Sequence, residues 1–226
     1  MLGCVLAFVL GPATGFGHGD AAARDLAAHA YYDHWGVVPA RLLHGPVRGA
    51  WTLVTALFVH GGWPHLLGNM LFLYVFGALV EERLGRLHYA LFYVAAGALA
   101  LLGYALANGG SQQALVGASG AISAVLGAFL RLFPGARVTS LFPFLFFLPL
   151  RFPAWVVLPF WLALQWLAAR GADGAAGAGG VAYLAHLIGF ALGFGYAWTV
   201  YGRGAGRRAG GYSGTPARAS EGDSAP

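Results

Sequence analysis

The segment "HGGWPHLLGNMLFLYVFG", His60–Gly77, holds the clearest membrane-spanning pattern in the chain. A helix needs about 20 mostly apolar residues to cross the hydrocarbon layer of a bilayer. We therefore predict a transmembrane helix over Trp63–Val80. Two polar side chains interrupt this helix, His65 and Asn69, and their four-residue spacing places them on one helix face. Both the helix and its polar face need an explanation.

Composition extends the membrane prediction to the whole chain. Of its 226 residues, 58% are hydrophobic and only 9% are charged, and the mean hydropathy is +0.66. A soluble globule carries more polar surface than this. All 13 basic residues are arginines scattered between apolar segments, which indicates topology determinants rather than a nucleic-acid partner. The single Cys4 can form no intramolecular disulfide, and we expect it to be buried as a small apolar side chain.

Five further apolar segments are candidates for helices, some of them too short to cross the bilayer alone. The predicted fold class is therefore all-α, a polytopic membrane protein built as a bundle of six transmembrane helices. Besides Trp63–Val80, the expected helices are Leu2–Phe16, Leu87–Ala107, Ala118–Phe133, Ala154–Ala169 and Val181–Tyr201.

Three regions follow from this arrangement. Residues 1–37 are expected to contain a short or truncated first transmembrane helix, as a misplaced start codon would leave, and the start of an external loop. Residues 38–202 would form the membrane core. Residues 203–226, rich in Gly, Ser, Ala and Arg, read as a disordered cytoplasmic tail. Nine arginines fall on one side of the bundle and four on the other, which places both termini in the cytoplasm.

Two later segments also carry polar groups where the bilayer makes them costly. Ser119 stands between glycines in "GASGAISAVLGA", and His186 lies inside the last span, in "AYLAHLIGFALG". Each has a structural alternative. A serine beside the small-residue stripe Gly120, Ala124 and Ala128 can simply allow close helix packing. Buried histidines and asparagines can join helices through hydrogen bonds.

The combination of these residues favours chemistry over packing, because a nucleophile, a base and two donors are the parts needed for acyl transfer. Serine becomes a useful nucleophile when a base takes its proton, and His186 is the natural base. The backbone N–H of Ser119, at a helix N-terminus, would stabilise an oxyanion, and His65 and Asn69 could add side-chain donors. No acidic residue lies near His186 in the predicted helices, so a Ser–His dyad is expected rather than a triad.

Competing motifs do not fit. The stretch around Ser119 lacks the last glycine of a G-x-S-x-G elbow, and no strand precedes it. His60 and His65 are five residues apart, unlike the two histidines of H-E-x-x-H. We therefore predict no metal and no cofactor. A small-solute transporter would explain buried His and Asn residues, but it predicts internal repeats, which the sequence lacks.

The chain resembles the rhomboid family of intramembrane serine proteases over roughly residues 38–201. The resemblance rests on an ordered set of motifs: "TALFVHGGWPHLLGNMLFLYVFG", "VEERLG", "GASGAISAVLGA" and "AYLAHLIGFALG". It implies a six-helix bundle in which the serine helix is short and begins below the membrane surface. Water would then reach the serine from the external side, where residues 108–113, "NGGSQQ", supply polar groups. Residues 170–180 would correspond to a cap over the site.

The resemblance also implies a role for each matched residue. Ser119 would be the nucleophile and His186 the general base, while His65, Asn69 and the Ser119 N–H would form the oxyanion hole. Glu81 and Arg83 match a structural E-x-R motif, and Gly120 and Gly189 would be packing residues. Two family features are absent: Trp51 is followed by Thr52 instead of arginine, and Ser123 stands where many members have an aromatic that packs on the histidine.

The predicted function is an intramembrane serine endopeptidase that hydrolyses peptide bonds in or near transmembrane segments. Its partners would be membrane protein substrates and the lipid bilayer, with no nucleic acid and no prediction of oligomeric state. The family resemblance implies substrates with helix-breaking residues and a small residue before the scissile bond. The expected location is a prokaryotic plasma membrane. The alternative is a catalytically silent rhomboid-like protein that binds transmembrane helices without cutting them.

Overall fold

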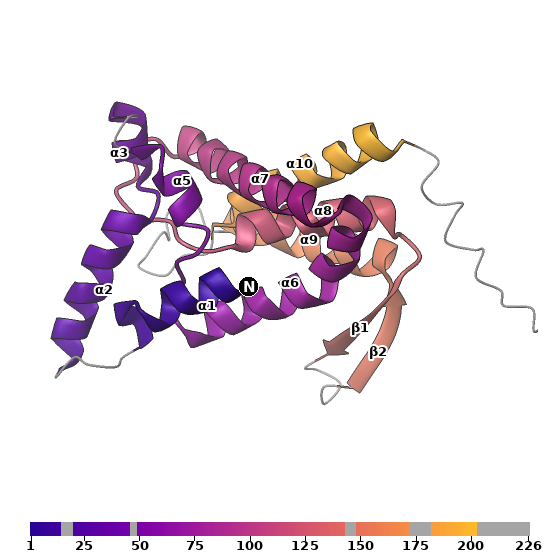
Figure 1. The fold of residues 1–226 in the computed structure, drawn as a ribbon, viewed down its shortest axis with the longest axis horizontal. Helices are drawn as coiled ribbons and strands as arrows, with labels where there is room; N and C mark the ends of the chain where they lie inside the picture. Colours follow the sequence, from indigo (N-terminus) through magenta and orange to yellow (C-terminus); the bar gives the residue numbers. More distant parts are fainter. Residues whose placement is uncertain (15–19, 46–48, 143–147, 172–181, 203–226) are drawn as a thin grey trace, which may run out of the picture.

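The computed structural model describes residues 1–14, 20–45, 49–142, 148–171 and 182–202 (Figure 1). Within these residues three helices are long and apolar enough to cross a membrane, α6 (Trp63–Leu84), α7 (Arg86–Ala107) and α10 (Tyr183–Tyr201). The apolar helices α8 (Ser119–Leu132) and α9 (Ala154–Gly171) are shorter. The prediction of a helical, polytopic membrane protein is confirmed, and the five later helices begin and end within a few residues of their predicted bounds.

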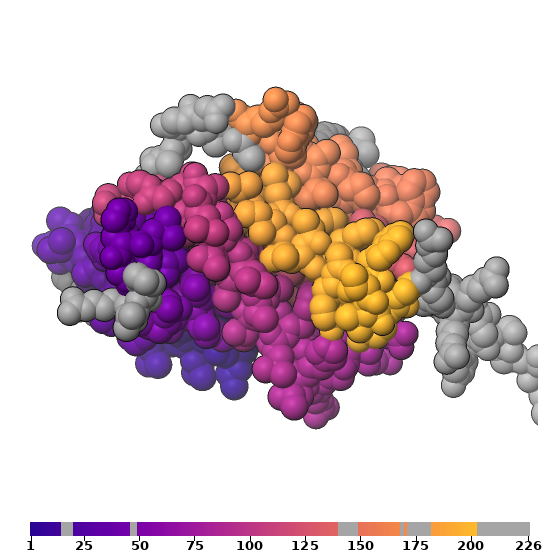
Figure 2. All heavy atoms as spheres, turned by 90° about the horizontal axis from the view of Figure 1, so that it is seen from above, coloured from indigo at the N-terminus to yellow at the C-terminus, as the bar shows by residue number. Residues whose placement is uncertain are grey.

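Helix α8 is the centre of the bundle. Every residue from Gly120 to Phe129 is buried, and α6, α7, α9 and α10 all contact this helix. In Figure 2, α10 lies between α7 and α9 on the face shown. The outer faces of α6 and α7 carry exposed large apolar side chains such as Leu71 and Leu87. Apolar side chains inside and outside are what a bundle surrounded by lipid tails requires.

Helices α6, α8 and α10 run in the same direction. The guanidinium of Arg83, near the end of α6, stands 4.9 Å from the ring centre of Tyr201, the last residue of α10. That of Arg131, near the end of α8, stands 4.8 Å from the ring centre of Trp198. The C-terminal ends of the three helices therefore lie together. Their N-terminal ends, which carry the predicted site residues, meet at the opposite end of the bundle.

The N-terminal part differs from the prediction of a first helix over Leu2–Phe16. Helix α1 (Leu2–Val9) is shorter, because Gly11 and Pro12 stop it and a 3₁₀ turn, η1 (Pro12–Thr14), follows. The segment between α1 and α6 contains α2 (Ala21–Trp35), α3 (Pro39–His44) and α5 (Thr52–Thr55). It is attached to the bundle by an antiparallel bridge between Val37 and Leu115, just before α8.

A β-hairpin between α8 and α9 was not predicted. Strands β1 (Arg137–Phe142) and β2 (Leu148–Pro153) pair antiparallel, with Arg137 opposite Pro153 and Phe142 opposite Leu148. The hairpin projects from the bundle in Figure 1. The predicted cap falls mostly on residues 172–180, and the predicted tail falls on 203–226. Both lie outside the described residues.

Candidate active site

The nucleophile candidate, Ser119, is the first residue of α8. The chain enters this helix through Gly117, whose φ of 130° is a conformation that residues with a Cβ rarely adopt. The Gly117 N–H donates to the carbonyl of Ala56 at 2.9 Å, which fixes the entry. No side chain caps the helix at Ala118. The first N–H groups of α8 therefore have no partner in their own helix, and the helix dipole favours negative charge beside them.

The base candidate, His186, is the fourth residue of α10. Its Nε2 lies 2.8 Å from the Oγ of Ser119, although the two residues are 67 positions apart in the chain. The histidine is buried, with 7% of its surface exposed, whereas Ser119 is partly exposed. A serine that can meet substrate and a histidine shielded behind it are arranged as a nucleophile and its general base.

Backbone contact between α8 and α10 holds this pair together. A Cβ on Gly189, one turn after His186, would overlap the carbonyl oxygen of Gly120. One turn further, a Cβ on Gly193 would overlap the carbonyl oxygen of Ala124. Only glycine therefore allows the two helices to approach this closely. The small residues that allow this packing and the candidate nucleophile Ser119 occupy the same helix. The packing interpretation and the catalytic interpretation of the segment are therefore compatible.

His65 also points toward this place. Its Nδ1 accepts a hydrogen bond from the Gly61 N–H at 3.3 Å. A neutral imidazole that accepts at Nδ1 carries its proton on Nε2. Gly117 has no Cβ, and a Cβ added there would lie 2.8 Å from the His65 Nε2 and 3.8 Å from the Ser119 Oγ. The His65 Nε2–H is thus a donor beside the candidate nucleophile, with only Gly117 between them.

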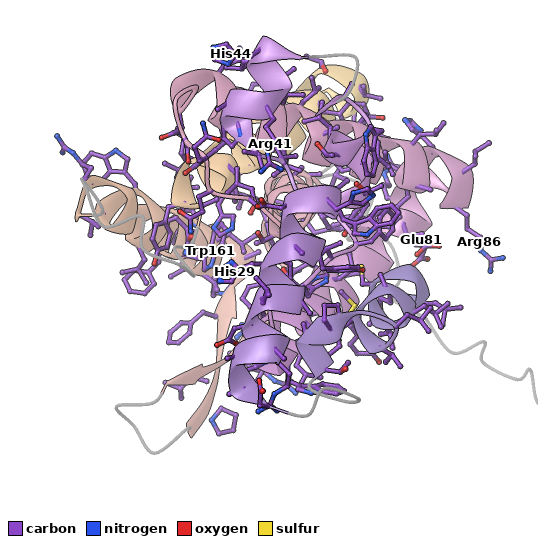
Figure 3. All side chains as sticks on the ribbon, turned by 90° about the vertical axis from the view of Figure 1, so that its left-hand side faces the viewer. His29, Arg41, His44, Glu81, Arg86 and Trp161 are labelled. Atoms are coloured by element: carbon purple, nitrogen blue, oxygen red, sulfur yellow. The ribbon has the colours of Figure 1, made fainter. Side chains whose placement is uncertain are left out.

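Asn69 is buried one turn deeper in α6, and its side-chain amide donates to the carbonyl of His65 at 3.0 Å. Its amide nitrogen carries two hydrogens, so one N–H bonds to the His65 carbonyl and the second is left to donate to a substrate. Two of the predicted structural residues, Glu81 and Arg83, lie away from the site. Glu81 and Arg83 are at the far end of α6, and Glu81 lies near Arg86 on one flank of the bundle, away from Trp161 (Figure 3).

His60 lies just before α6 and packs edge-to-face on His65, with ring centres 5.1 Å apart. Its Nδ1 donates to the Phe58 carbonyl at 3.2 Å. Burial, and after it the nearby His65, lower the pKa of His60 from 6.5 to about 4. His60 therefore stays neutral at physiological pH. Among the described residues, no three His, Cys, Asp or Glu side chains gather as a metal site would require.

Two residues of α9 also lie against His186, and neither was predicted. The Oε1 of Gln165 lies 2.7 Å from the Nδ1 of His186. The ring of Trp161 lies beside the imidazole, with centres 6.2 Å apart and planes 30° apart. The sequence did contain a signal for Gln165, since it is a polar side chain within the apolar span Ala154–Ala169. The same reasoning that selected His186 applies to it.

Comparisons with known proteins all point to one family. The Rhomboid domain matches residues 47–203. "Rhomboid protein 1, mitochondrial" of Saccharomyces cerevisiae is 35% identical over 153 residues, covering 66% of this chain and 41% of that protein. "RHOMBOID-like protein 5" of Arabidopsis thaliana is 34% identical over 95 residues, covering 42% of this chain and 30% of that protein.

A bacterial protein also matches. YdcA of Bacillus subtilis is 32% identical over 80 residues, covering 35% of this chain and 40% of that protein. The chain thus spans less than half the length of each of these curated relatives.

Proposed function

Because this chain belongs to the rhomboid family, whose domain matches residues 47–203, we propose that it is a serine endopeptidase that acts within the membrane. Its substrates would be other membrane proteins, cut in or beside their transmembrane segments. The observation that carries the proposal is the 2.8 Å hydrogen-bond distance between the Ser119 Oγ and the His186 Nε2. A packing serine has no need of a buried histidine at that distance.

The proposed reaction proceeds in two halves. The Ser119 Oγ attacks the scissile carbonyl carbon while its proton passes to the His186 Nε2. The resulting oxyanion accepts hydrogen bonds from the Ser119 N–H and the His65 Nε2–H, with the second N–H of the Asn69 amide as a further donor. His186 then gives its proton to the leaving amine. Water, activated by the same histidine, hydrolyses the acyl-enzyme and restores the serine.

The position of the site limits its substrates. A helical segment has its carbonyls bonded within the helix, so it must unwind locally before Ser119 can attack. This favours segments with helix-breaking residues. Ser119 begins a helix of 14 residues, about 21 Å long at 1.5 Å per residue. That is shorter than a hydrocarbon layer of about 30 Å, so the nucleophile would sit recessed from one membrane surface with water reaching it from that side.

The protein is an integral membrane protein. Its relatives include proteins named as mitochondrial and a bacterial one, so they do not support the prediction of a prokaryotic plasma membrane over other membranes. Placement of both termini in the cytoplasm stays a prediction from arginine counting.

A fluorophosphonate probe tests the proposal, because it reacts with serines that are activated as nucleophiles. The purified protein in detergent is expected to be labelled, and the variants Ser119→Ala and His186→Ala are expected to lose the label. Ser123→Ala is the matched control, since it removes the neighbouring serine of α8, whose hydroxyl donates to the Ser119 carbonyl at 2.7 Å. An unlabelled wild type, or equal labelling of Ser119→Ala, would favour a silent helix-binding protein instead.

A further inference from the structure

One face of α9 lies against the histidine of the candidate dyad. Trp161 and Gln165 are four residues apart, so they share that face. Trp161 lies alongside the imidazole, and the Gln165 Oε1 lies 2.7 Å from its Nδ1. Trp161 also contacts Phe190, one turn after His186 in α10, with ring centres 6.3 Å apart. The imidazole is therefore supported on one side by an aromatic ring and at one nitrogen by an amide.

The amide determines which nitrogen of His186 carries the proton. A carbonyl oxygen only accepts hydrogen bonds, so the Gln165 Oε1 can bond to His186 only if the proton is on Nδ1, which then donates to it. The neutral ring then presents a lone pair at Nε2, the atom that faces the Ser119 hydroxyl. In the other tautomer Nε2 would carry a proton and could not accept the one from the serine.

We propose that Gln165 is a positioning residue that holds His186 in the tautomer able to act as a base. Gln165, His186 and Ser119 then form a continuous hydrogen-bond chain from α9 through α10 to α8. This inference rests on the proposed protease function. Gln165 touches neither substrate nor reacting atoms, and it acts only through the histidine.

The residue type fits its place in the bundle. A carboxylate would hold the same tautomer, but a charged group within an apolar span is far more costly than an amide. The aromatic support also comes from α9 rather than from α8. The position in α8 where the family resemblance expects an aromatic is Ser123, and its hydroxyl bonds to the Ser119 carbonyl instead. Trp161 supplies a ring against the histidine from the neighbouring helix.

Three α9 variants test the proposal by the rate of fluorophosphonate labelling and by kcat on a transmembrane model substrate. Gln165→Met keeps the size of the side chain but removes the acceptor, and kcat is expected to fall about tenfold with KM unchanged. Gln165→Glu keeps the acceptor, so kcat per folded protein is expected to remain close to wild type even though the charged group lowers stability. Leu164→Met is the matched control, because it adds the same side chain at the adjacent, exposed position of α9. Wild-type kcat in Gln165→Met, or equal losses in the Met and Glu variants, would overturn the proposal.

Nitrogen NMR of protein labelled with ¹⁵N-histidine reads the tautomer without any need for activity, and His186→Ala assigns the signal. The wild type is expected to carry its His186 proton on Nδ1, and Gln165→Met is expected to shift toward the other tautomer. A wild-type proton on Nε2, or no change in the variant, would overturn the proposal. An unlabelled wild type with an Nδ1 proton would instead reject only the proposed protease function.

Discussion

Adding one methyl group at Gly193 should separate α8 from α10. A Cβ there would lie 2.7 Å from the Cα of Ala124 and would overlap the Ala124 carbonyl. Carbon atoms in ordinary contact are about 3.5–4.0 Å apart, so the helices would have to move apart by about 1 Å. Overpacking of this kind typically costs about 1–3 kcal/mol of stability. Gly193→Ala should therefore melt at a lower temperature in detergent.

The same displacement should slow the reaction. Gly193 is two turns from His186 on α10, so the separation extends toward the dyad. A misplacement of about 1 Å can cost on the order of 100-fold in rate. The rate of fluorophosphonate labelling of Ser119 measures this loss directly, without a transmembrane substrate.

Gly195→Ala provides the matched control for Gly193→Ala. It makes the same substitution two residues later in α10, where nothing lies within 4 Å of the added Cβ. Because alanine is favoured over glycine inside a helix, this variant should be more stable by about 0.5–1 kcal/mol and should label at the wild-type rate. A Gly193→Ala protein with the melting temperature and labelling rate of wild type would refute backbone contact between α8 and α10.

Two further predictions concern the residues at the start of α6. Asn69→Ala should lower kcat by about 10²–10³-fold, because it removes one donor to the oxyanion. If the variant cleaves a transmembrane substrate at the wild-type rate, Asn69 is not part of the proposed oxyanion hole. His60 should make the protein less stable in acid: its folded-state pKa is about 4, against 6.5 for the free side chain, so the unfolded chain gains a proton that the folded chain does not. Stability is therefore retained above the unfolded pKa and lost as the pH falls from 6.5 toward 4. The melting temperatures at about pH 8 and about pH 5 should differ less in His60→Asn than in wild type. The control His29→Asn, at an exposed position of α2 (Figure 3), should leave the difference unchanged. An equal difference in all three proteins would contradict the role of His60 in acid sensitivity.

The sequence predicted the helices well where an apolar run was long and ended at a glycine. Gly85, with a φ of 83°, separates α6 from α7, and the predicted spans on either side are close to the observed ones. The predicted first helix was wrong in its length, because the run of apolar residues outweighed the stop signal of Gly11 and Pro12. The hairpin was missed for a related reason, since short segments rich in Leu, Phe and Pro show no clear period of two.

Among the polar residues too, some could be predicted from the sequence and one could not. Ser119, His65 and His186 could be predicted as site residues because each is a known kind of catalytic group in an apolar setting. Gln165 is chemically plain, and its role depends on which helix faces His186. Helix neighbours across the bundle cannot be read from spacing along one helix, so the position of α9 had to come from the structure.

The hydrogen bond between Ser119 and His186 joins residues 67 positions apart, and this separation has a consequence for synthesis. Ribosomes make the chain from its N-terminus, so α8 enters the membrane with Ser119, the proposed nucleophile, well before α10 brings His186, the proposed base. A nascent chain that has not yet inserted α10 holds Ser119 without a proton acceptor. The glycines that let α10 reach α8 therefore also determine when the proposed dyad is complete: only after the last described helix has docked.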